Sequence, residues 1–215
     1  MIILVPLGGI GKRFSDLGYT DPKPLIKVKG KELIFWLLDS LKTKKNDRIY
    51  LIYNNFLENY KFEEKILSKH KNVSFLKLPI NTKGPIQTIN EFIKISNYKD
   101  QKEKVAIIDG DVFFNIDILS KIRSQKYSSL FYFKTKEIKP IYSYIKLYKK
   151  DVVDIAEKIK ISSNANCGVY FFANLEILKK NIILSLKKSK TNLYISDVFK
   201  QLLKSKLKVK SFLLN

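Results

Sequence analysis

Glycines and cationic side chains gather near the N-terminus of the 215-residue chain. Residues 8–13 are Gly-Gly-Ile-Gly-Lys-Arg, and Lys23 follows further along. Glycines that follow a strand let the backbone approach a phosphate closely and turn its N–H groups toward it. Lys12, Arg13 and Lys23 add positive charges that can neutralise a triphosphate. On the glycines alone, a phosphate-binding loop and a plain strand-to-helix turn are equally good interpretations.

The glycine segment differs from two common phosphate-binding motifs. A P-loop needs a Gly-Lys-Ser/Thr ending, which is missing here. The dinucleotide-binding fingerprint needs a third glycine, and Phe14 stands at that position. The segment is therefore neither of these motifs.

Apolar periodicity in the N-terminal half predicts alternating strands and helices. We expect strands at 2–7, 48–53, 73–78 and 104–108, and helices at 31–41, 56–70 and 85–95. This β-α-β-α-β-α-β order implies a mostly parallel sheet with helices on both faces. Ligands of such sheets bind at the carboxyl ends of the strands. Residues 8–13 and Asp109-Gly110-Asp111 both follow predicted strands, so we expect them to line one crevice.

The C-terminal half has a different pattern. Strands are expected at 128–133, 141–148, 152–156, 167–172 and 207–214, and helices at 175–186 and 193–203. No linker rich in Pro, Gly or Ser and no internal repeat divides the sequence. With 45% apolar residues the chain can bury a core. We therefore expect one domain over residues 1–215.

The formal charge of +21 has two competing explanations. One is a polyanionic partner such as RNA or an anionic membrane, and the other is a lysine-biased surface. Arginine, which base readers and bidentate phosphate clamps prefer, occurs only at positions 13, 48 and 123. The lysines are spread along the whole chain. We favour the lysine-biased surface and expect no nucleic-acid partner, and such a surface still steers anionic substrates.

The single cysteine and the single histidine exclude further site classes. Cys167 alone forms neither an intramolecular disulfide framework nor a cysteine metal site. His70 lies in a lysine-rich stretch and is interpreted as a surface histidine. The N-terminus lacks the pattern of a signal peptide, and no stretch approaches the ~20 apolar residues that span a bilayer. We expect a cytoplasmic protein without membrane insertion.

The N-terminal segment as a whole resembles a known family signature. Residues 7–13, followed by Asp-Pro-Lys-Pro-Leu-Ile at 21–26, are similar to two elements of the sugar-1-phosphate nucleotidyltransferase superfamily. These elements are a glycine-rich loop that ends in arginine and a Pro-Lys-x-Leu sequence. Residues 18–26, Gly-Tyr-Thr-Asp-Pro-Lys-Pro-Leu-Ile, look like the same segment of members found in bacterial capsule and surface-glycan gene sets. Less specific similarities continue to the C-terminal end, at 82–88, 109–111, 156–158, 166–172 and 194–197.

The resemblance implies a fold and a reaction. The fold is a three-layer Rossmann-like α/β fold of the glycosyltransferase-A-like type, with a mostly parallel mixed sheet. Residues 1–112 would form the nucleotide-binding half and residues 113–215 the acceptor-binding half. The reaction is transfer of an NMP group from CTP, UTP or dTTP to a sugar-1-phosphate or similar small phosphorylated acceptor, with release of pyrophosphate. Because the attacking phosphate is already an anion, positioning and charge neutralisation suffice without a histidine or serine base.

The resemblance also implies roles for individual residues. Mg²⁺ takes one or two carboxylates, for which Asp111 is the better match and Asp109 the second. Arg13 and Lys23 would be catalytic on the α- and β-phosphates, and Lys158 on the acceptor phosphate. Nucleotide contacts are implied for Leu7, Gly8, Gly9, Gly11, Lys12, Arg13, Thr82, Gly84, Gln87 and Asp109, and acceptor contacts for Glu157, Lys158 and Gly168.

Ordinary structural roles compete with several of these assignments. Residues 109–111 have the composition of a plain turn. Lys158 lies in Glu-Lys-Ile-Lys and fits a solvated lysine equally well. Gln87 fits the polar face of an amphipathic helix equally well.

The chain departs from the family pattern in two places. Leu7 stands where a small residue is usual. The second metal aspartate of a late loop has no counterpart, because residues 211–215 are Ser-Phe-Leu-Leu-Asn. Three explanations stay open: a ligand from elsewhere, a site with one protein carboxylate, or a chain that is a fragment. Homo-oligomer formation is also left open.

Other functions compete with nucleotidyl transfer to a sugar phosphate. A nucleotide-sugar-dependent glycosyltransferase would also use an Asp-x-Asp sequence after a strand, but residues 8–13 would then have no role. A non-sugar cytidylyltransferase, such as a phosphocholine-type enzyme, would keep the chemistry and change the acceptor. A nucleotide-sensing or nucleic-acid-binding module without catalysis would fit the missing aspartate and the +21 charge.

Overall fold

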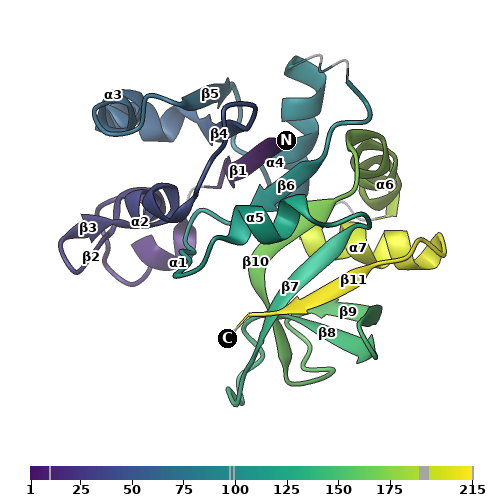
Figure 1. The fold of residues 1–215 in the computed structure, drawn as a ribbon. Helices are drawn as coiled ribbons and strands as arrows, with labels where there is room; N and C mark the ends of the chain where they lie inside the picture. The colour runs from purple at the N-terminus through teal and green to yellow at the C-terminus, as the bar shows by residue number, and fades with distance from the viewer. Residues whose placement is uncertain (10, 97, 99, 189–193, 215) are drawn as a thin grey trace.

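The computed structural model describes residues 1–9, 11–96, 98, 100–188 and 194–214, and for Lys12 and Arg13 the backbone alone. Its main feature is a nine-stranded sheet with helices on both faces (Figure 1). The strands are β1 (Ile2–Leu7), β4 (Arg48–Asn54), β5 (Val73–Leu78), β6 (Val105–Ile108), β7 (Ser129–Lys134), β8 (Ser143–Tyr148), β9 (Asp151–Glu157), β10 (Asn164–Phe172) and β11 (Lys210–Leu213). The α-helices are α1 (Lys12–Ser15), α2 (Leu33–Ser40), α3 (Phe62–Leu67), α4 (Pro85–Ile95), α5 (Ile118–Arg123), α6 (Leu175–Lys188) and α7 (Ile195–Lys204).

The N-terminal half of the sheet is parallel and contains a switch point. The strand order is β5-β4-β1-β6-β10-β7-β11-β9-β8, and β1 pairs in parallel with both β4 and β6. The chain goes from β1 to one side, through β4 and β5, and then returns to the other side with β6. Ligands of open α/β sheets bind at the carboxyl ends of the strands where this reversal occurs. The loops that start at Gly8 and Asp109 follow the two strands concerned.

Alternating side chains of β1 enter two separate hydrophobic layers. Ile2 and Leu4 pack with buried residues of α4, α6 and α7, whereas Ile3 and Val5 pack with those of α2, α3 and α5. Successive side chains of a strand point to opposite faces, so a fully apolar β1 is buried on both sides. The predicted three-layer α/β fold is confirmed.

The C-terminal half of the sheet is mostly antiparallel. β10 pairs antiparallel with both β6 and β7, and β8 pairs antiparallel with β9. β11 pairs in parallel with β7 and antiparallel with β9. The sheet is therefore mixed, and its parallel character is concentrated in the half that carries β1. The division into a nucleotide half and an acceptor half stays a prediction.

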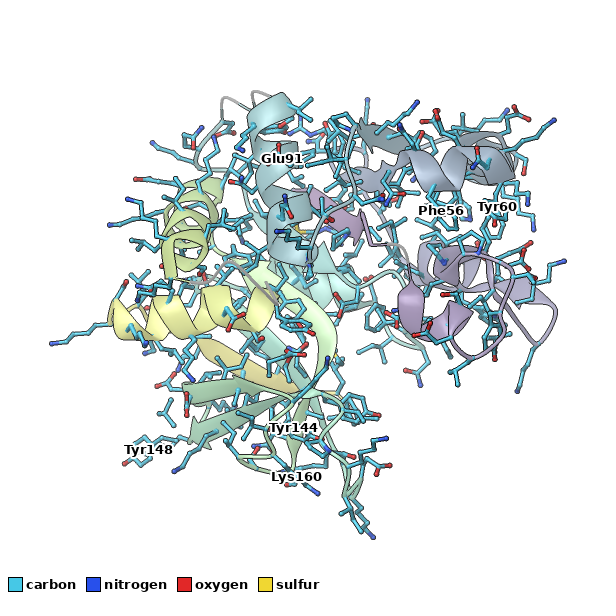
Figure 2. The ribbon with its side chains drawn as sticks, turned by 180° about the vertical axis from the view of Figure 1, so that it is seen from behind. Phe56, Tyr60, Glu91, Tyr144, Tyr148 and Lys160 are labelled. Carbon is cyan, nitrogen blue, oxygen red and sulfur yellow. The ribbon has the colours of Figure 1, made fainter. Side chains whose placement is uncertain are left out.

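The single helix predicted over 56–70 is wrong. The segment forms a 3-10 helix, η2 (Asn55–Tyr60), and then α3, with Lys61 between them at φ 51°. A left-handed residue interrupts the helical hydrogen-bond ladder, so one continuous helix cannot form. Phe56 and Tyr60 pack edge to face in η2, with ring centroids 5.6 Å apart, beside α3 (Figure 2).

Several short elements escape sequence periodicity altogether. They are α1, α5, the 3-10 helix η1 (Lys23–Leu25) and the hairpin of β2 (Lys27–Val28) with β3 (Lys31–Glu32). Elements of two to six residues carry too few positions for a periodic pattern. None of the helices in the described part of the chain has the length and apolar character that a membrane crossing requires.

His70 is less exposed than the prediction of a surface histidine implies. Its side chain retains 16% exposure, and Nε2 lies 2.8 Å from Oδ1 of Asp39. The imidazole also stacks on Phe35, with ring centroids 5.9 Å apart. The residue therefore joins α2 to the segment after α3.

Candidate active site

A cavity of about 1140 Å³ opens at the carboxyl ends of β1 and β6 and extends to β9 and β10. Its position is the switch point at which a ligand is expected. It brings together residues from both halves of the chain, far apart in sequence. Of the residues implied by the family resemblance, Leu7, Gly8, Gly9, Gly11, Lys23, Gly84, Asp109, Asp111, Glu157, Lys158 and Gly168 line it.

Gly8 is held between β1 and the start of α4. A Cβ atom at this position would lie 2.5 Å from Oγ1 of Thr82 and 2.7 Å from Oγ1 of Thr88. The two threonine hydroxyls are hydrogen-bonded to each other at 2.6 Å. Only glycine leaves room for the two hydroxyls so close to its Cα. The backbone of the loop can therefore lie on the cavity wall.

The carbonyl of Gly8 is bonded to two residues that do not line the cavity. It accepts hydrogen bonds from Nδ2 of Asn54 at 2.8 Å and from the N–H of Thr82 at 3.2 Å. The N–H of Gly9 points the opposite way, because a trans peptide places its C=O and N–H groups on opposite sides. Asn54 was not singled out from the sequence, because an asparagine at a strand end carries no motif.

Thr82 and Gln87 do not line the cavity. The hydroxyl of Thr82 is bonded to Thr88, and Oε1 of Gln87 accepts a hydrogen bond from the N–H of Lys83 at 2.8 Å. Both side chains shape the loop before α4, of which Gly84 faces the cavity. Their contacts with a nucleotide stay predictions.

Lys12 and Arg13 begin α1, directly after Gly11. Gly11 has φ +67°, a left-handed conformation that glycine adopts without strain. The side chains of Lys12 and Arg13 lie outside the described residues, so their predicted phosphate contacts stay predictions.

Leu7, which departs from the family pattern, packs against the acidic loop. It is buried, and a Cβ atom on Gly110 would lie 2.4 Å from its Cδ2. Leu7 and the glycine between the two aspartates therefore fit each other. The larger side chain at position 7 fills space that Gly110 leaves free.

Lys23 and Asp111 form an ion pair in the cavity. Nζ of Lys23 lies 2.6 Å from Oδ2 of Asp111, and both side chains keep about a third of their exposure, 31% and 37%. Nζ also lies 5.5 Å from the ring centroid of Phe14. A predicted phosphate ligand and a predicted metal ligand therefore neutralise each other in this state.

Asp109 is set in place by Gly168. The N–H of Asp109 donates to the carbonyl of Gly168 at 2.9 Å, and Gly168 has φ +79°. A Cβ atom on Gly168 would lie 2.9 Å from Oδ2 of Asp109 and from Cγ1 of Val112. Gly168 sits in a β-bulge of β10, at which the register with β7 shifts. The glycine thus lets the carboxylate lie directly on the strand.

Burial raises the pKa of Asp109 to about 7, and the negative charges of Asp111 and Glu157 act in the same direction while Lys23 opposes them. Two carboxylates that face one cavity disfavour each other's ionisation. A cation between them would reverse this effect. The donor set of Asp109 and Asp111 fits Mg²⁺, which usually takes one or two protein carboxylates.

The described residues hold no cluster of three or more His, Cys, Asp or Glu side chains arranged to bind a metal. Phosphate oxygens and water could complete the coordination shell of a cation at Asp109 and Asp111. This arrangement suits Mg²⁺, which keeps several waters and substrate phosphates in its coordination shell.

Glu157 and Lys158 form the opposite wall of the cavity. Oε2 of Glu157 accepts hydrogen bonds from the hydroxyls of Ser143 and Ser196. Lys158 has φ 51°, its N–H donates to the carbonyl of Tyr142 at 2.9 Å, and its Nζ donates to Oη of Tyr194 at 2.9 Å. The two serines and the tyrosine were not identified as site residues from the sequence.

Comparison with known proteins assigns the family. A profile described as nucleotidyl transferase matches residues 1–215. A candidate mannose-1-phosphate guanyltransferase of Sulfolobus acidocaldarius is 27% identical over 192 residues, which cover 86% of this chain and 52% of the relative. A D-glycero-alpha-D-manno-heptose 1-phosphate guanylyltransferase of Campylobacter jejuni is 25% identical over 174 residues, which cover 79% of this chain and 75% of the relative.

The fold has a close structural counterpart. A nucleoside-diphosphate-sugar pyrophosphorylase of Vibrio cholerae superposes with a TM-score of 0.78 at 20% identity, over 100% of this chain and 92% of that one. The chain spans about half the length of the Sulfolobus relative. The sequence prediction of the family is confirmed: the chain belongs to the nucleotidyl transferase family.

Proposed function

We propose that the chain transfers an NMP group from an NTP to a sugar-1-phosphate and releases pyrophosphate, with Mg²⁺ as cofactor. The observation that carries the proposal is that two groups of charged residues, from different parts of the chain, line the same cavity. The glycine loop, Lys23, Asp109 and Asp111 form one wall, and Glu157 with Lys158 forms the other. A triphosphate and a second phosphorylated molecule can therefore meet in it.

The reaction needs no general base. A phosphate oxygen of the acceptor attacks the α-phosphorus of the NTP, a new P–O bond forms, and the bond from the α-phosphorus to the bridging oxygen breaks. Pyrophosphate leaves with the electron pair of that bond. The work of the protein is to align the two anions and to offset their charge.

The residues of the first wall would hold the triphosphate. Backbone N–H groups of the glycine loop and the ammonium of Lys23 would face its phosphates, with Arg13 beside them. Asp111 and Asp109 would hold Mg²⁺, which when bound neutralises phosphate charge. Lys23 would then exchange its ion pair with Asp111 for one with a phosphate.

The residues of the second wall would hold the acceptor. Lys158 would bind the acceptor phosphate, and Glu157 would accept hydrogen bonds from sugar hydroxyls with the oxygen that the serines leave free. On the nucleotide side, the segment of Thr82, Gly84 and Gln87 would form the binding site of the nucleotide base. Gly168 would sit against the acceptor beside Asp109.

The base and the biological role are finer parts of the proposal. The family resemblance favours CTP, UTP or dTTP and a role in capsule or surface-glycan synthesis in the cytoplasm. Two relatives carry guanylyltransferase in their names, so GTP joins the candidate nucleotides. The test must therefore include each of these nucleotides and ATP as a reference.

Pyrophosphate release, measured for each nucleotide with a panel of hexose, heptose and non-sugar phosphates, tests the proposal. Release is expected only with both an acceptor and Mg²⁺ present. Strong release with phosphocholine and none with sugar phosphates would assign the non-sugar alternative. Release of a nucleoside diphosphate from a nucleotide sugar, with no release of pyrophosphate from any NTP, would favour glycosyl transfer and contradict the proposal.

A further inference from the structure

Lys158 is aimed into the cavity by constraints on its backbone. Its φ of 51° is uncommon for a residue with a side chain, and such conformations persist where the surroundings hold them. Here the hydrogen bond from the N–H of Lys158 to the carbonyl of Tyr142 holds this conformation. The preceding carboxylate, Glu157, is bonded to Ser143 and Ser196. The ammonium is therefore placed apart from that carboxylate.

The two cavity lysines differ in what they touch. Lys23 is ion-paired with Asp111. Within the described part of the chain, the polar contact of the Lys158 ammonium is with a neutral group, Oη of Tyr194, at 2.9 Å. The same ammonium lies 4.9 Å from the centroid of the Tyr194 ring. A cation next to a phenol keeps its full charge for a ligand.

Among the described residues, the hydroxyl of Tyr194 is bonded only as an acceptor, so its donor is open to a ligand. This hydroxyl accepts from Lys158, and a phenol that accepts one hydrogen bond still carries its own O–H proton. The backbone at Tyr194 is anchored, because its N–H donates to Oδ2 of Asp197 at 3.2 Å at the start of α7. Tyr194 lines the cavity next to Lys158. The O–H group and the ammonium are thus two fixed donors on one side of the cavity.

We propose that Tyr194 and Lys158 form a two-donor clamp for the acceptor phosphate, in which the Tyr194 hydroxyl both positions the ammonium and donates to a phosphate oxygen. This inference rests on the proposed function. A hydrogen bond to a charged group contributes more than one between neutral groups, so loss of this one hydroxyl has a measurable effect.

The variant Tyr194→Phe tests the clamp because it removes one oxygen and keeps the ring. We expect the KM for the sugar phosphate to rise about 10-fold or more, as for a hydrogen bond to a charged group. The KM for the NTP and the melting temperature should not change. The control is Tyr148→Phe, which removes a phenol that is 67% exposed on β8 and projects into solvent (Figure 2). It should leave both KM values unchanged.

A double-mutant cycle with Lys158→Met adds a second readout. If the two donors act on one phosphate, the losses in kcat/KM for the acceptor are less than multiplicative, because the first change already disrupts the clamp. An acceptor KM for Tyr194→Phe within twofold of wild type, or equal rises in both KM values, would overturn the clamp. No turnover by the wild type with any substrate pair would instead overturn the proposed function, and the clamp with it.

Discussion

The two walls of the cavity hold their charged groups in different ways. On the β1 and β6 side, Lys23 is ion-paired with Asp111, and Asp109 lies beside them with a pKa raised by burial to about 7. On the β9 and β10 side, Glu157 is bonded to hydroxyls and Lys158 to a phenol. The β1 and β6 side, the proposed nucleotide wall, must exchange an ion pair to bind a phosphate, whereas the β9 and β10 side, the proposed acceptor wall, presents a ready cation. Nucleotide binding should therefore depend on Mg²⁺ far more than acceptor binding.

The largest effect is expected for Asp111→Asn, which breaks the nucleotide wall. It removes a proposed Mg²⁺ ligand and breaks the ion pair of Lys23 with residue 111. We expect kcat/KM to fall by about 10²-fold or more, the scale for loss of one electrostatic group at a transition state. Steady-state pyrophosphate release over a range of MgCl₂ concentrations measures it. The control is Asp16→Asn, which changes an exposed carboxylate directly after α1. Equal rates for the two variants would refute the role of Asp111.

The next effect is expected on the acceptor wall, for Lys158→Ala. The KM for the sugar phosphate should rise about 10- to 100-fold, since a charge-assisted contact is lost. The KM for the NTP should stay near wild type. Lys160→Ala is the matched control, two residues on at the outer side of the β8–β9 region (Figure 2), where its Nζ bonds the carbonyl of Glu137. A rise confined to the NTP would mean that the walls are assigned the wrong way round.

A smaller effect is expected for Gly8→Ala. The added methyl group would meet the Thr82 and Thr88 hydroxyls, whereas one on Gly9 meets nothing within 4 Å. Gly8→Ala should lower the melting temperature by several degrees, the scale of about 1–3 kcal/mol for overpacking. Gly9→Ala should not. Differential scanning calorimetry of both variants measures the difference, and equal melting temperatures would show that Gly8 is not tightly enclosed.

A further effect on stability concerns pH and Asp109. Its folded-state pKa of about 7 lies above the usual value of 3.8, so the folded chain keeps a proton that the unfolded chain has lost between these values. Its contribution to stability is therefore present at low pH and is lost as pH rises toward 7. Asp109→Asn should remove this loss and raise the melting temperature more at pH 8 than at pH 5. A shift that is equal at both pH values would contradict the raised pKa.

The N-terminal half of the fold could be predicted because its central strands, β1 and β6, are apolar runs buried on both faces. β5 and α4 have the predicted bounds, since the apolar residues at 73, 75, 76 and 78 mark the strand and a proline marks the helix start. The convergence of residues 8–11 and 109–111 followed from the rule for switch points in α/β sheets.

The acceptor wall could be predicted only in part. The resemblance implied Glu157, Lys158 and Gly168 as site residues. It covered residues 194–197 without giving Tyr194 or Ser196 a role, and nothing in the sequence pointed to Ser143. Their roles depend on the pairing of β8 with β9 and on the packing of the start of α7 near β9. Both bring together residues that are distant in sequence. Local patterns do not encode such contacts.

The central claim is that one cavity joins an NTP to a sugar phosphate. Phosphorus NMR of the chain with Mg²⁺, each NTP in turn and a mixture of hexose and heptose 1-phosphates tests it most directly. We expect signals of an NDP-sugar and of pyrophosphate to grow in equal amounts, with at least one NTP and only when an acceptor is present. Growth of orthophosphate alone, or unchanged NTP signals with every nucleotide, would contradict the claim.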